Sequence, residues 1–361
     1  IVFVLEETDY SHEVATAAAP APLRKPQPFF IELGRNKLAK DKESLIFLRN
    51  QYTEVTRMTI GAEIDAYVRE HTGDGWGLYT SAFEYQLSNP GDSKRLLELP
   101  EQLKVKGLQE EERDLIKDEI KDIVTRADLR GDFYLDFDDE KDIRKAQQDA
   151  FRIIQHLHVS PKWKIPMNMM KIYFSGKKGI HVIVPYQAFG IEWHPFLDQV
   201  YRIMAEELVP FAPNNTLDMK VYERRRQFRI PRSMHASTGA YKVPMELKNL
   251  LGKSEVAVQE LAKDQNYGSW IKYEEPKQIM EATRYFKECE QKFADRYKKQ
   301  KYSKQGEATT LDFEPPCSTE MIENGPVKGS RNVVGCLLVA YWKQRGMSEQ
   351  ETWDELVQWN D

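Results

Sequence analysis

Residues 132–138 read Asp-Phe-Tyr-Leu-Asp-Phe-Asp, an alternation of apolar and acidic side chains. In a β-strand alternate side chains face opposite ways, so the apolar residues are expected in the core and Asp136 and Asp138 together on the other face. A rise of about 3.3 Å per residue places the two carboxylates about 7 Å apart. Carboxylates so placed can hold divalent cations that clamp the attacking and leaving oxygens of an in-line phosphoryl displacement. The alternative interpretation is an exposed strand face that happens to be acidic.

A second motif, Ser-Gly-Lys-Lys-Gly-Ile-His at residues 175–181, forms a turn between two β-prone runs. Its glycines let backbone amides approach an anion closely, and Lys177 and Lys178 add positive charge that suits a triphosphate. His181 stands one residue into the returning strand, where an imidazole can donate to a phosphate oxygen. The alternatives are a plain surface hairpin and a hydrogen-bonded structural histidine.

A third carboxylate, Asp218, lies in an apolar, strand-prone setting. A carboxylate there needs a partner, and a metal ion is one solution. Residues 229–239, Arg-Ile-Pro-Arg-Ser-Met-His-Ala-Ser-Thr-Gly, then join cations, hydroxyls and an imidazole with a rigid proline and a turn glycine. This segment indicates a second phosphate clamp, and the alternative is a strand that ends in a polar turn.

Composition restricts how the chain can bind a polyanion. The 361 residues carry a net charge of −5, so nucleic acid binding requires local basic patches. One candidate patch contains five arginines within nine residues: Arg224, Arg225, Arg226, Arg229 and Arg232. Arginine forks match phosphate geometry, whereas a run of lysines is more typical of a solvated surface.

The length suggests about two domains, and 41% hydrophobic residues suffice for an ordinary core. The longest apolar run, residues 333–342, is far short of a membrane span, and residues 1–5 are too short for a signal-peptide core. The absence of an initiator Met suggests an excised fragment. Three widely spaced cysteines form neither a disulfide framework nor a zinc knuckle, so we expect a cytoplasmic protein.

Hydrophobic periodicity predicts an α+β fold. We expect helices at 41–71, 93–126 with a break at Pro100, 140–158, 192–208 and 276–301, and strands at 77–85, 132–138, 169–174 and 180–184. A last helix is expected to open with a capping box between Ser348 and Glu351.

In their order and spacing these motifs resemble the archaeo-eukaryotic primase superfamily. The residues that carry the resemblance are Tyr-Leu-Asp136-Phe-Asp138, Ser175-Gly-Lys-Lys-Gly-Ile-His181, Leu-Asp218 and Arg229-Ile-Pro-Arg-Ser233-Met-His235. It covers roughly residues 50–250. Because no cysteine lies between residues 1 and 288, the zinc stem of archaeal and eukaryotic small subunits is missing, and the chain is more similar to primase-polymerases of bacteria, phages, plasmids and defence systems.

The resemblance implies a DNA primase or polymerase that makes or extends primers from nucleoside triphosphates, with a catalytic core of mixed or antiparallel sheets and flanking helices. It implies that two Mg²⁺ or Mn²⁺ ions are bound by Asp136, Asp138 and Asp218. It implies that the incoming nucleotide is bound by Ser175, Lys177, Lys178, His181, Arg229, Ser233 and His235. Binding of nucleic acid is expected at Arg224, Arg225, Arg226 and Arg232. The expected partners are a single-stranded DNA template, a primer strand and NTPs or dNTPs, with no membrane, and a helicase or another replication or defence protein is a further candidate.

The tail carries a second resemblance. Phe-Glu-Pro-Pro-Cys at residues 313–317, followed by Gly-Ser-Arg-Asn at 329–332, is similar to the start of the iron–sulfur domain of primase large subunits. There the cysteine after Pro-Pro is the first of four cluster ligands, which makes Cys317 the candidate ligand in the full-length protein. We expect Cys336 to be a buried structural thiol and any further ligands to lie beyond Asp361, so no iron–sulfur cluster is expected in this fragment.

The predicted organisation combines both resemblances. Its parts are an N-terminal linker or arm at 1–40, a catalytic domain at 41–260 with a helical insertion at about 92–130, a helical connector at 261–310 and a C-terminal helical accessory module at 311–361. Two other functions stay open on the sequence. One is a non-catalytic, nucleic-acid-binding replication accessory with a vestigial triad, and the other is a metal-dependent nuclease, which has no need for a triphosphate cradle.

Overall fold

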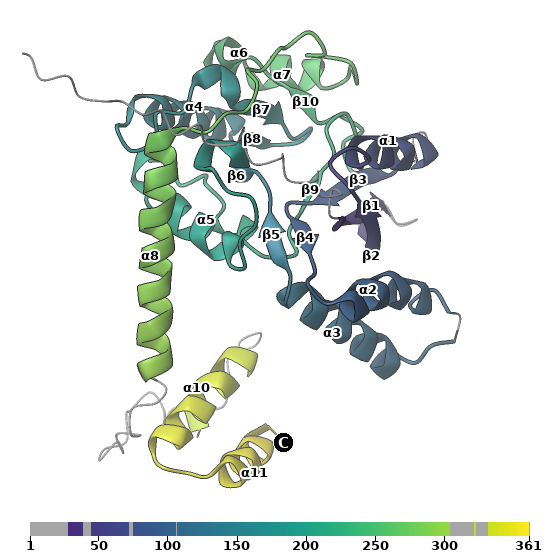
Figure 1. The fold of residues 1–361 in the computed structure, drawn as a ribbon, viewed down its shortest axis with the longest axis vertical. Coiled ribbons are helices and arrows are strands. Elements are labelled where there is room, and N and C mark those ends of the chain that lie inside the picture. Colours follow the sequence, from purple (N-terminus) through teal and green to yellow (C-terminus); the bar gives the residue numbers. More distant parts are fainter. Residues whose placement is uncertain are drawn as a thin grey trace, which may run out of the picture. The chain divides into compact units, whose positions relative to one another are not determined.

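A computed structural model describes residues 28–38, 45–71, 75–105, 107–303, 321–322 and 331–360. Two antiparallel sheets with surrounding helices confirm the α+β class (Figure 1). The chain divides into two compact units, Ile1–Glu290 and Gln291–Asp361. In the described part of the chain, no helix combines the length and the apolar character needed to cross a membrane.

The first sheet has six strands in the order β5-β4-β1-β3-β9, with β2 paired to β1. Its strands are β1 (Phe29–Leu38), β2 (Leu45–Val55), β3 (Gly77–Ser81), β4 (Glu84–Gln86), β5 (Asp128–Arg130) and β9 (Gln227–Arg229). Phe29, Ile31 and Leu33 of β1 are buried on one face of the strand, and helix α1 (Ile60–His71) packs on that face through Tyr67, Ile60 and Ile64. One face of this sheet is thus closed by a short amphipathic helix.

The N-terminal predictions need correction. Residues 29–38 were predicted to belong to a linker or arm, but they form β1, which pairs with β2, β3 and β4. The predicted helix at 41–71 is strand β2 in its first part and helix only from Ile60. The reason is that β2 gains its stability by pairing along the whole of β1, a partner that local periodicity does not reveal. The rest of the predicted arm, residues 1–27 and 39–40, lies outside the described residues.

The second sheet has the order β10-β7-β8-β6. Its strands are β6 (Phe133–Asp138), β7 (Lys171–Phe174), β8 (Gly179–Val184) and β10 (Val243–Pro244). Phe133, Leu135 and Phe137 have no exposed surface, and helix α4 (Ile143–Val159) contacts β6 and β8. The alternation predicted for this segment is therefore confirmed, and the opposite face of β6 is left to its polar residues.

The register between neighbouring strands determines which residues lie side by side on that polar face. Asp136 lies opposite His181, which lies opposite Tyr173, and the neighbouring row pairs Asp138 with Gly179. Residues opposite one another in a sheet project to the same side. The sheet therefore collects carboxylates, an imidazole and the glycine hairpin on one surface.

Helices complete the first unit. Their bounds are α2 (Pro90–Gln102), α3 (Glu110–Thr125), α5 (Leu197–Glu206), α6 (Leu247–Gly252), α7 (Glu255–Leu261) and α8 (Met280–Ser303), which continues past Glu290. The insertion predicted at about 92–130 holds α2 and α3, but its end is β5 of the first sheet. Pro100 was predicted to break the helix, yet it lies within the last turn of α2. The helical segment is interrupted instead between Gln102, where α2 ends, and Glu110, where α3 begins.

The second unit contains α10 (Arg331–Gln344) and α11 (Glu349–Asn360). Ser348 N donates to Glu351 Oε2 at 2.8 Å and Glu351 N donates to Ser348 Oγ at 3.3 Å, which confirms the capping box. Cys336 is exposed, contrary to the prediction of a buried thiol, because the buried stripe of α10 follows a different face: Val334, Leu338, Tyr341 and Trp342. Cys317 lies outside the described residues.

Candidate active site

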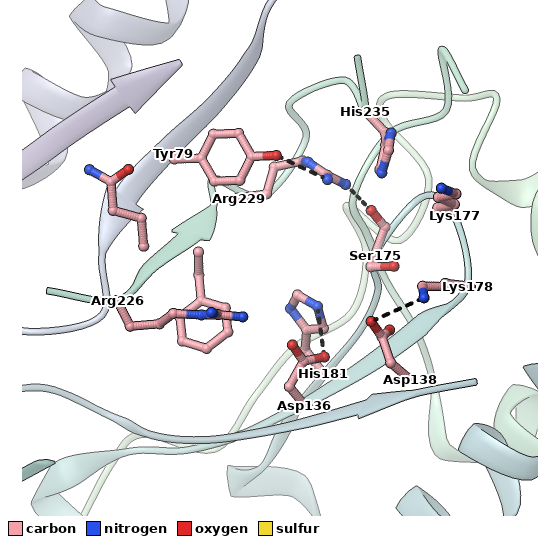
Figure 2. A pocket seen from close by; sticks show the side chains of 12 residues that line it. Tyr79, Asp136, Asp138, Ser175, Lys177, Lys178, His181, Arg226, Arg229 and His235 are labelled. Atoms are coloured by element: carbon pink, nitrogen blue, oxygen red, sulfur yellow. Dashed lines mark hydrogen bonds and ion pairs between the residues drawn. The ribbon is translucent and has the colours of Figure 1, made fainter. Parts of the chain in front are cut away.

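A cavity of about 170 Å³ lies between the polar face of the second sheet and strands β3 and β9 of the first. Figure 2 shows the side chains that line it. They include most of the residues that the sequence predicted for the site: Asp136, Asp138, Ser175, Lys177, Lys178, His181, Arg226, Arg229 and His235. The motifs separated by about 100 residues of sequence thus meet at one place.

Two glycines shape the hairpin beside the carboxylates. Gly176 has φ of 89°, and a Cβ there would lie 2.9 Å from the Ala240 carbonyl oxygen. A Cβ on Gly179 would lie 2.1 Å from Asp138 Oδ1. Ser175 closes the turn, since its Oγ accepts a hydrogen bond from Gly179 N at 2.9 Å. Gly176 is required by its backbone conformation, whereas the missing side chain of Gly179 leaves room for the Asp138 carboxylate.

Asp136 is buried, with 7% of its surface exposed. Within the described residues, no hydrogen-bond donor reaches its buried Oδ1. Burial, and then the charge of Asp138, raises the pKa of Asp136 from its usual 3.8 to about 7. Burial also raises the pKa of Asp138. A nearby cation would favour the charged forms of these two carboxylates.

His181 does not supply that cation. Its Nε2 lies 3.4 Å from Asp136 Oδ1. Burial, followed by the charges of Lys242, Arg229 and Arg226, lowers the pKa of His181 well below its usual value, so the imidazole is neutral at neutral pH. A neutral ring beside the carboxylate can donate or accept a hydrogen bond but cannot balance its charge.

The third aspartate, Asp218, is brought to β6 by its backbone. Asp218 N donates to Asp136 O, and Asp138 N donates to Thr216 O, both at 2.8 Å. Its side chain is engaged elsewhere: Oδ1 accepts from Lys220 N at 2.8 Å, and Oδ2 lies 3.8 Å from Arg226 Nη2. In the part of the chain that the structure describes, no three His, Cys, Asp or Glu side chains are gathered to hold a metal ion. Asp136 and Asp138 therefore face the cavity, while Asp218 stands beside them and pairs with Arg226.

Positive groups line the same cavity. Arg229 donates to Ser175 O and, at 3.2 Å, to the Tyr79 hydroxyl, which holds the guanidinium between the hairpin and β3 (Figure 2). Lys178 Nζ lies 3.0 Å from Glu140 Oε1 and 4.0 Å from Asp138 Oδ2. Burial, and then Arg229 and Lys177, lowers the pKa of His235 to about 3. The cavity thus combines fixed cations and a neutral imidazole, a donor set suited to phosphate oxygens.

Four predicted residues are placed away from this cavity. Ser233 Oγ donates to Ile230 O at 2.7 Å and to Leu78 O at 3.1 Å. Arg224 donates to Ala127 O at 2.6 Å, and Arg225 lies 3.2 Å from the fully buried Glu32. Ser233 and Arg232 line a different cavity. Internal carbonyls and a buried carboxylate bind Ser233, Arg224 and Arg225, so the two arginines stabilise the fold rather than present a basic surface.

Lys242 is a residue that the sequence analysis missed. It is fully buried, its Nζ donates to Arg229 O at 2.9 Å, and the rings of Tyr134 and Tyr173 lie 5.6 and 5.1 Å away. Burial and then Arg229 lower its pKa to about 7, an effect that Asp136 opposes. A lysine directly before the apolar pair Val243–Pro244 was the available signal.

The two sheets are joined below the cavity by an aromatic pair. The ring of Tyr134 on β6 stacks on Phe228 of β9 with 3.9 Å between centroids and 10° between planes. Phe228 also lines the cavity. This contact fixes the distance between the carboxylate strand and the strand that carries Arg229.

No model of a known protein family matches this chain, and no curated protein matches it either. Among solved structures, the crystal structure of primase RepB′ aligns with it at 9% sequence identity over 91% of this chain and 81% of that chain, with a TM-score of 0.34. A TM-score this low carries no argument, so the functional conclusion depends on the residues of the site.

Proposed function

We propose that this chain is a metal-dependent, template-directed nucleotidyltransferase, a DNA primase or primase-polymerase. One observation carries the proposal: the Asp136–Asp138 pair, the glycine–lysine hairpin and Arg229 together line a single cavity. Carboxylates alone are common to many metal enzymes, but a triphosphate cradle beside them is specific to chemistry on nucleoside triphosphates.

The carboxylate pair fits divalent cations. Its buried oxygen without a donor and its raised pKa are both relieved by a bound cation, and oxygen ligands are those that Mg²⁺ and Mn²⁺ prefer. Asp136 and Asp138 would hold the ions, with Asp218 as a third ligand if it exchanges Arg226 for metal. When bound, the ions supply a lowered pKa for the attacking hydroxyl and charge stabilisation for the leaving oxygen.

The other residues bind and orient the triphosphate. Lys177, Lys178 and Arg229 neutralise its negative charge, and the hairpin amides donate to its oxygens. Neutral His181 and His235 each carry one ring N–H that can donate a hydrogen bond to a phosphate oxygen. In the reaction, the 3′-hydroxyl oxygen bonds to the α-phosphorus, the bond from that phosphorus to the pyrophosphate oxygen breaks, and the hydroxyl proton passes to solvent. The protein's main contribution is alignment of these atoms.

The nucleic acid partners follow from this chemistry: a single-stranded DNA template, a primer or an initiating nucleotide, and NTPs or dNTPs. Of the predicted arginine patch, Arg226 is the residue that lines the cavity. Electrostatic contact with a strand is therefore assigned to Arg226 and the exposed Arg232, and binding should weaken as salt rises.

The test incubates the chain with single-stranded template, Mn²⁺ or Mg²⁺ and labelled nucleotides, with and without primer. New template-dependent product that disappears in Asp138→Asn is the expected result, and Asp65→Asn, an exposed carboxylate on α1, is the matched control. Shortened template would indicate a nuclease, and retention of template without synthesis would indicate an accessory binding protein. Either result would overturn the proposal.

A further inference from the structure

Asp149 lies on the buried face of helix α4 and has no exposed surface. The same face of the helix is mostly apolar, with Ala146, Ala150 and Ile153 also buried. An aspartate in such surroundings is costly to bury unless hydrogen bonds satisfy its oxygens. Asp149 does not line the cavity of the candidate active site, so any effect of this carboxylate on that site is indirect.

Both carboxylate oxygens of Asp149 bind one short loop, residues 214–216. Oδ1 accepts from Asn214 N at 3.2 Å and from Asn214 Nδ2 at 2.9 Å. Oδ2 accepts from Thr216 N at 3.3 Å and from Thr216 Oγ1 at 2.9 Å. Between them, Asn215 has φ of 56°, a left-handed conformation that asparagine tolerates better than most residues. The loop thus gives two backbone amides and two side-chain donors to a single carboxylate.

The same loop is attached to the strand that carries the carboxylate pair. Thr216 O accepts from Asp138 N at 2.8 Å. Two residues further along the chain, Asp218 N donates to Asp136 O at 2.8 Å. Thr216 is therefore bound from two sides, by Asp149 of α4 and by the backbone of β6. Because Asp218 follows so closely, the contacts of Asp149 restrict where the Asp218 carboxylate can reach.

A fixed backbone matters at Asp218 because its carboxylate oxygen Oδ2 lies 3.8 Å from Arg226 Nη2. To join Asp136 and Asp138 on a cation, this side chain must turn away from Arg226 while its backbone stays beside β6. Removing a group that orients a metal ligand typically weakens metal binding by about 10- to 100-fold. Asp149 is placed to be such a group, because it holds the backbone from which the ligand projects.

We propose that Asp149 is a positioning residue for the metal site: its hydrogen bonds to residues 214–216 hold Asp218 within reach of the cations. Asp149 touches neither substrate nor metal and acts through Asp218. The inference rests on the proposed function, since a chain that binds no catalytic cation has no ligand to position.

The experiment titrates the full chain with Mn²⁺ alone and measures free Mn²⁺ by electron paramagnetic resonance. We expect Asp149→Asn to weaken Mn²⁺ binding about tenfold, and Thr216→Val, which removes one of the four donors, to weaken it less. Asp218→Asn should weaken binding at least as much as Asp149→Asn. The double variant should bind Mn²⁺ no more weakly than Asp218→Asn alone, because the effect of Asp149 passes through that residue.

The matched control is Asp198→Asn, which removes another buried aspartate, on helix α5. Asp198 lies 4.0 Å from Arg224 and does not line the cavity, so this variant should keep its Mn²⁺ affinity within twofold. Thermal unfolding establishes that each variant is folded before binding is compared. It also separates a loss of stability, which either substitution can cause, from a loss of metal affinity, which we expect from Asp149→Asn and not from Asp198→Asn.

Losses that add in the double variant would overturn the positioning role, because a lost charge or a loosened fold acts whether or not Asp218 is present. An unchanged Mn²⁺ affinity in Asp149→Asn would overturn it as well. A polymerisation assay on the wild type separates the two proposals. Normal synthesis with either of these results refutes the positioning role alone, whereas absent synthesis with a non-additive loss refutes the proposed function and retains a positioned metal site. No saturable Mn²⁺ binding by the wild type would overturn both.

Discussion

Replacing Asp136 with Asn should make the metal-free protein more stable while it abolishes synthesis. The folded protein holds the pKa of Asp136 at about 7, against 3.8 for an ordinary aspartate. The folded state therefore retains this proton between those pH values, and stability falls as pH rises through that window. At about 1.4 kcal/mol per pKa unit, the cost above pH 7 is roughly 4 kcal/mol.

Asn removes that cost but keeps a buried amide with unpaired polar atoms, which costs about 2 kcal/mol. The net gain for Asp136→Asn is about 2 kcal/mol at pH 8, or roughly 4 to 8 °C in Tm for a unit of this size, and it should vanish near pH 5. Differential scanning fluorimetry in EDTA at both pH values measures it, with Asp65→Asn as the control.

Added Mn²⁺ extends the same test. Mn²⁺ should raise the Tm of the wild type, because a ligand that binds only the folded state stabilises it, and it should not raise that of Asp136→Asn. A variant that melts at or below the wild-type temperature at pH 8 in EDTA would refute the reasoning that this carboxylate is held at an energetic cost for a cation.

Further changes test other parts of the site. Gly179→Ala should cut extension at least tenfold with little loss of stability, because the added Cβ displaces only the flexible end of Asp138. Gly176→Ala should cost about 1–3 kcal/mol in denaturant unfolding, because φ is 89° and a backbone carbonyl blocks the Cβ. Equal losses of stability in the two variants would contradict this reasoning. Arg229→Lys should raise the KM for the incoming triphosphate about tenfold, since a lysine cannot reproduce the fork, and an unchanged KM in steady-state extension would count against the cradle. Lys242 has a pKa of about 7 in the folded protein against 10.5 in the unfolded chain. Its contribution to the free energy of unfolding should therefore rise with pH between those values, by at most about 1.4 kcal/mol per pH unit. Lys242→Met should reduce this pH dependence in urea titrations at pH 7 and 9, and an unchanged pH dependence would exclude the effect.

Local pattern was sufficient for the strand that carries the carboxylates. The alternation of residues 132–138 predicts both the strand and its buried face, because the two-residue period of a strand decides which side chains are buried. The Ser175–His181 hairpin could also be predicted from local sequence, because its glycines and lysines are close together in the chain. Together these two segments supply the carboxylate pair, both lysines and one histidine of the candidate site.

Long-range strand pairing and the directions of side chains could not be predicted from local sequence. The pairing of β1 with β2 needs a partner strand that no local window contains, so the N-terminal region was misread as arm and helix. Arg224 and Arg225 looked like a basic patch, but buried oxygens of other elements bind them. For Asp218 the backbone lies beside β6, yet the side chain pairs with Arg226. Such choices depend on tertiary neighbours, not on residue type.

The central claim is that Asp136 and Asp138 bind the divalent ions of nucleotidyl transfer. Anomalous diffraction from crystals of the chain grown with Mn²⁺ and a non-hydrolysable nucleoside triphosphate tests it most directly. We predict anomalous peaks at coordination distance from both carboxylates, with the triphosphate between them and Arg229. Mn²⁺ and nucleotide bound at full occupancy elsewhere, with neither aspartate as a ligand, would contradict the account.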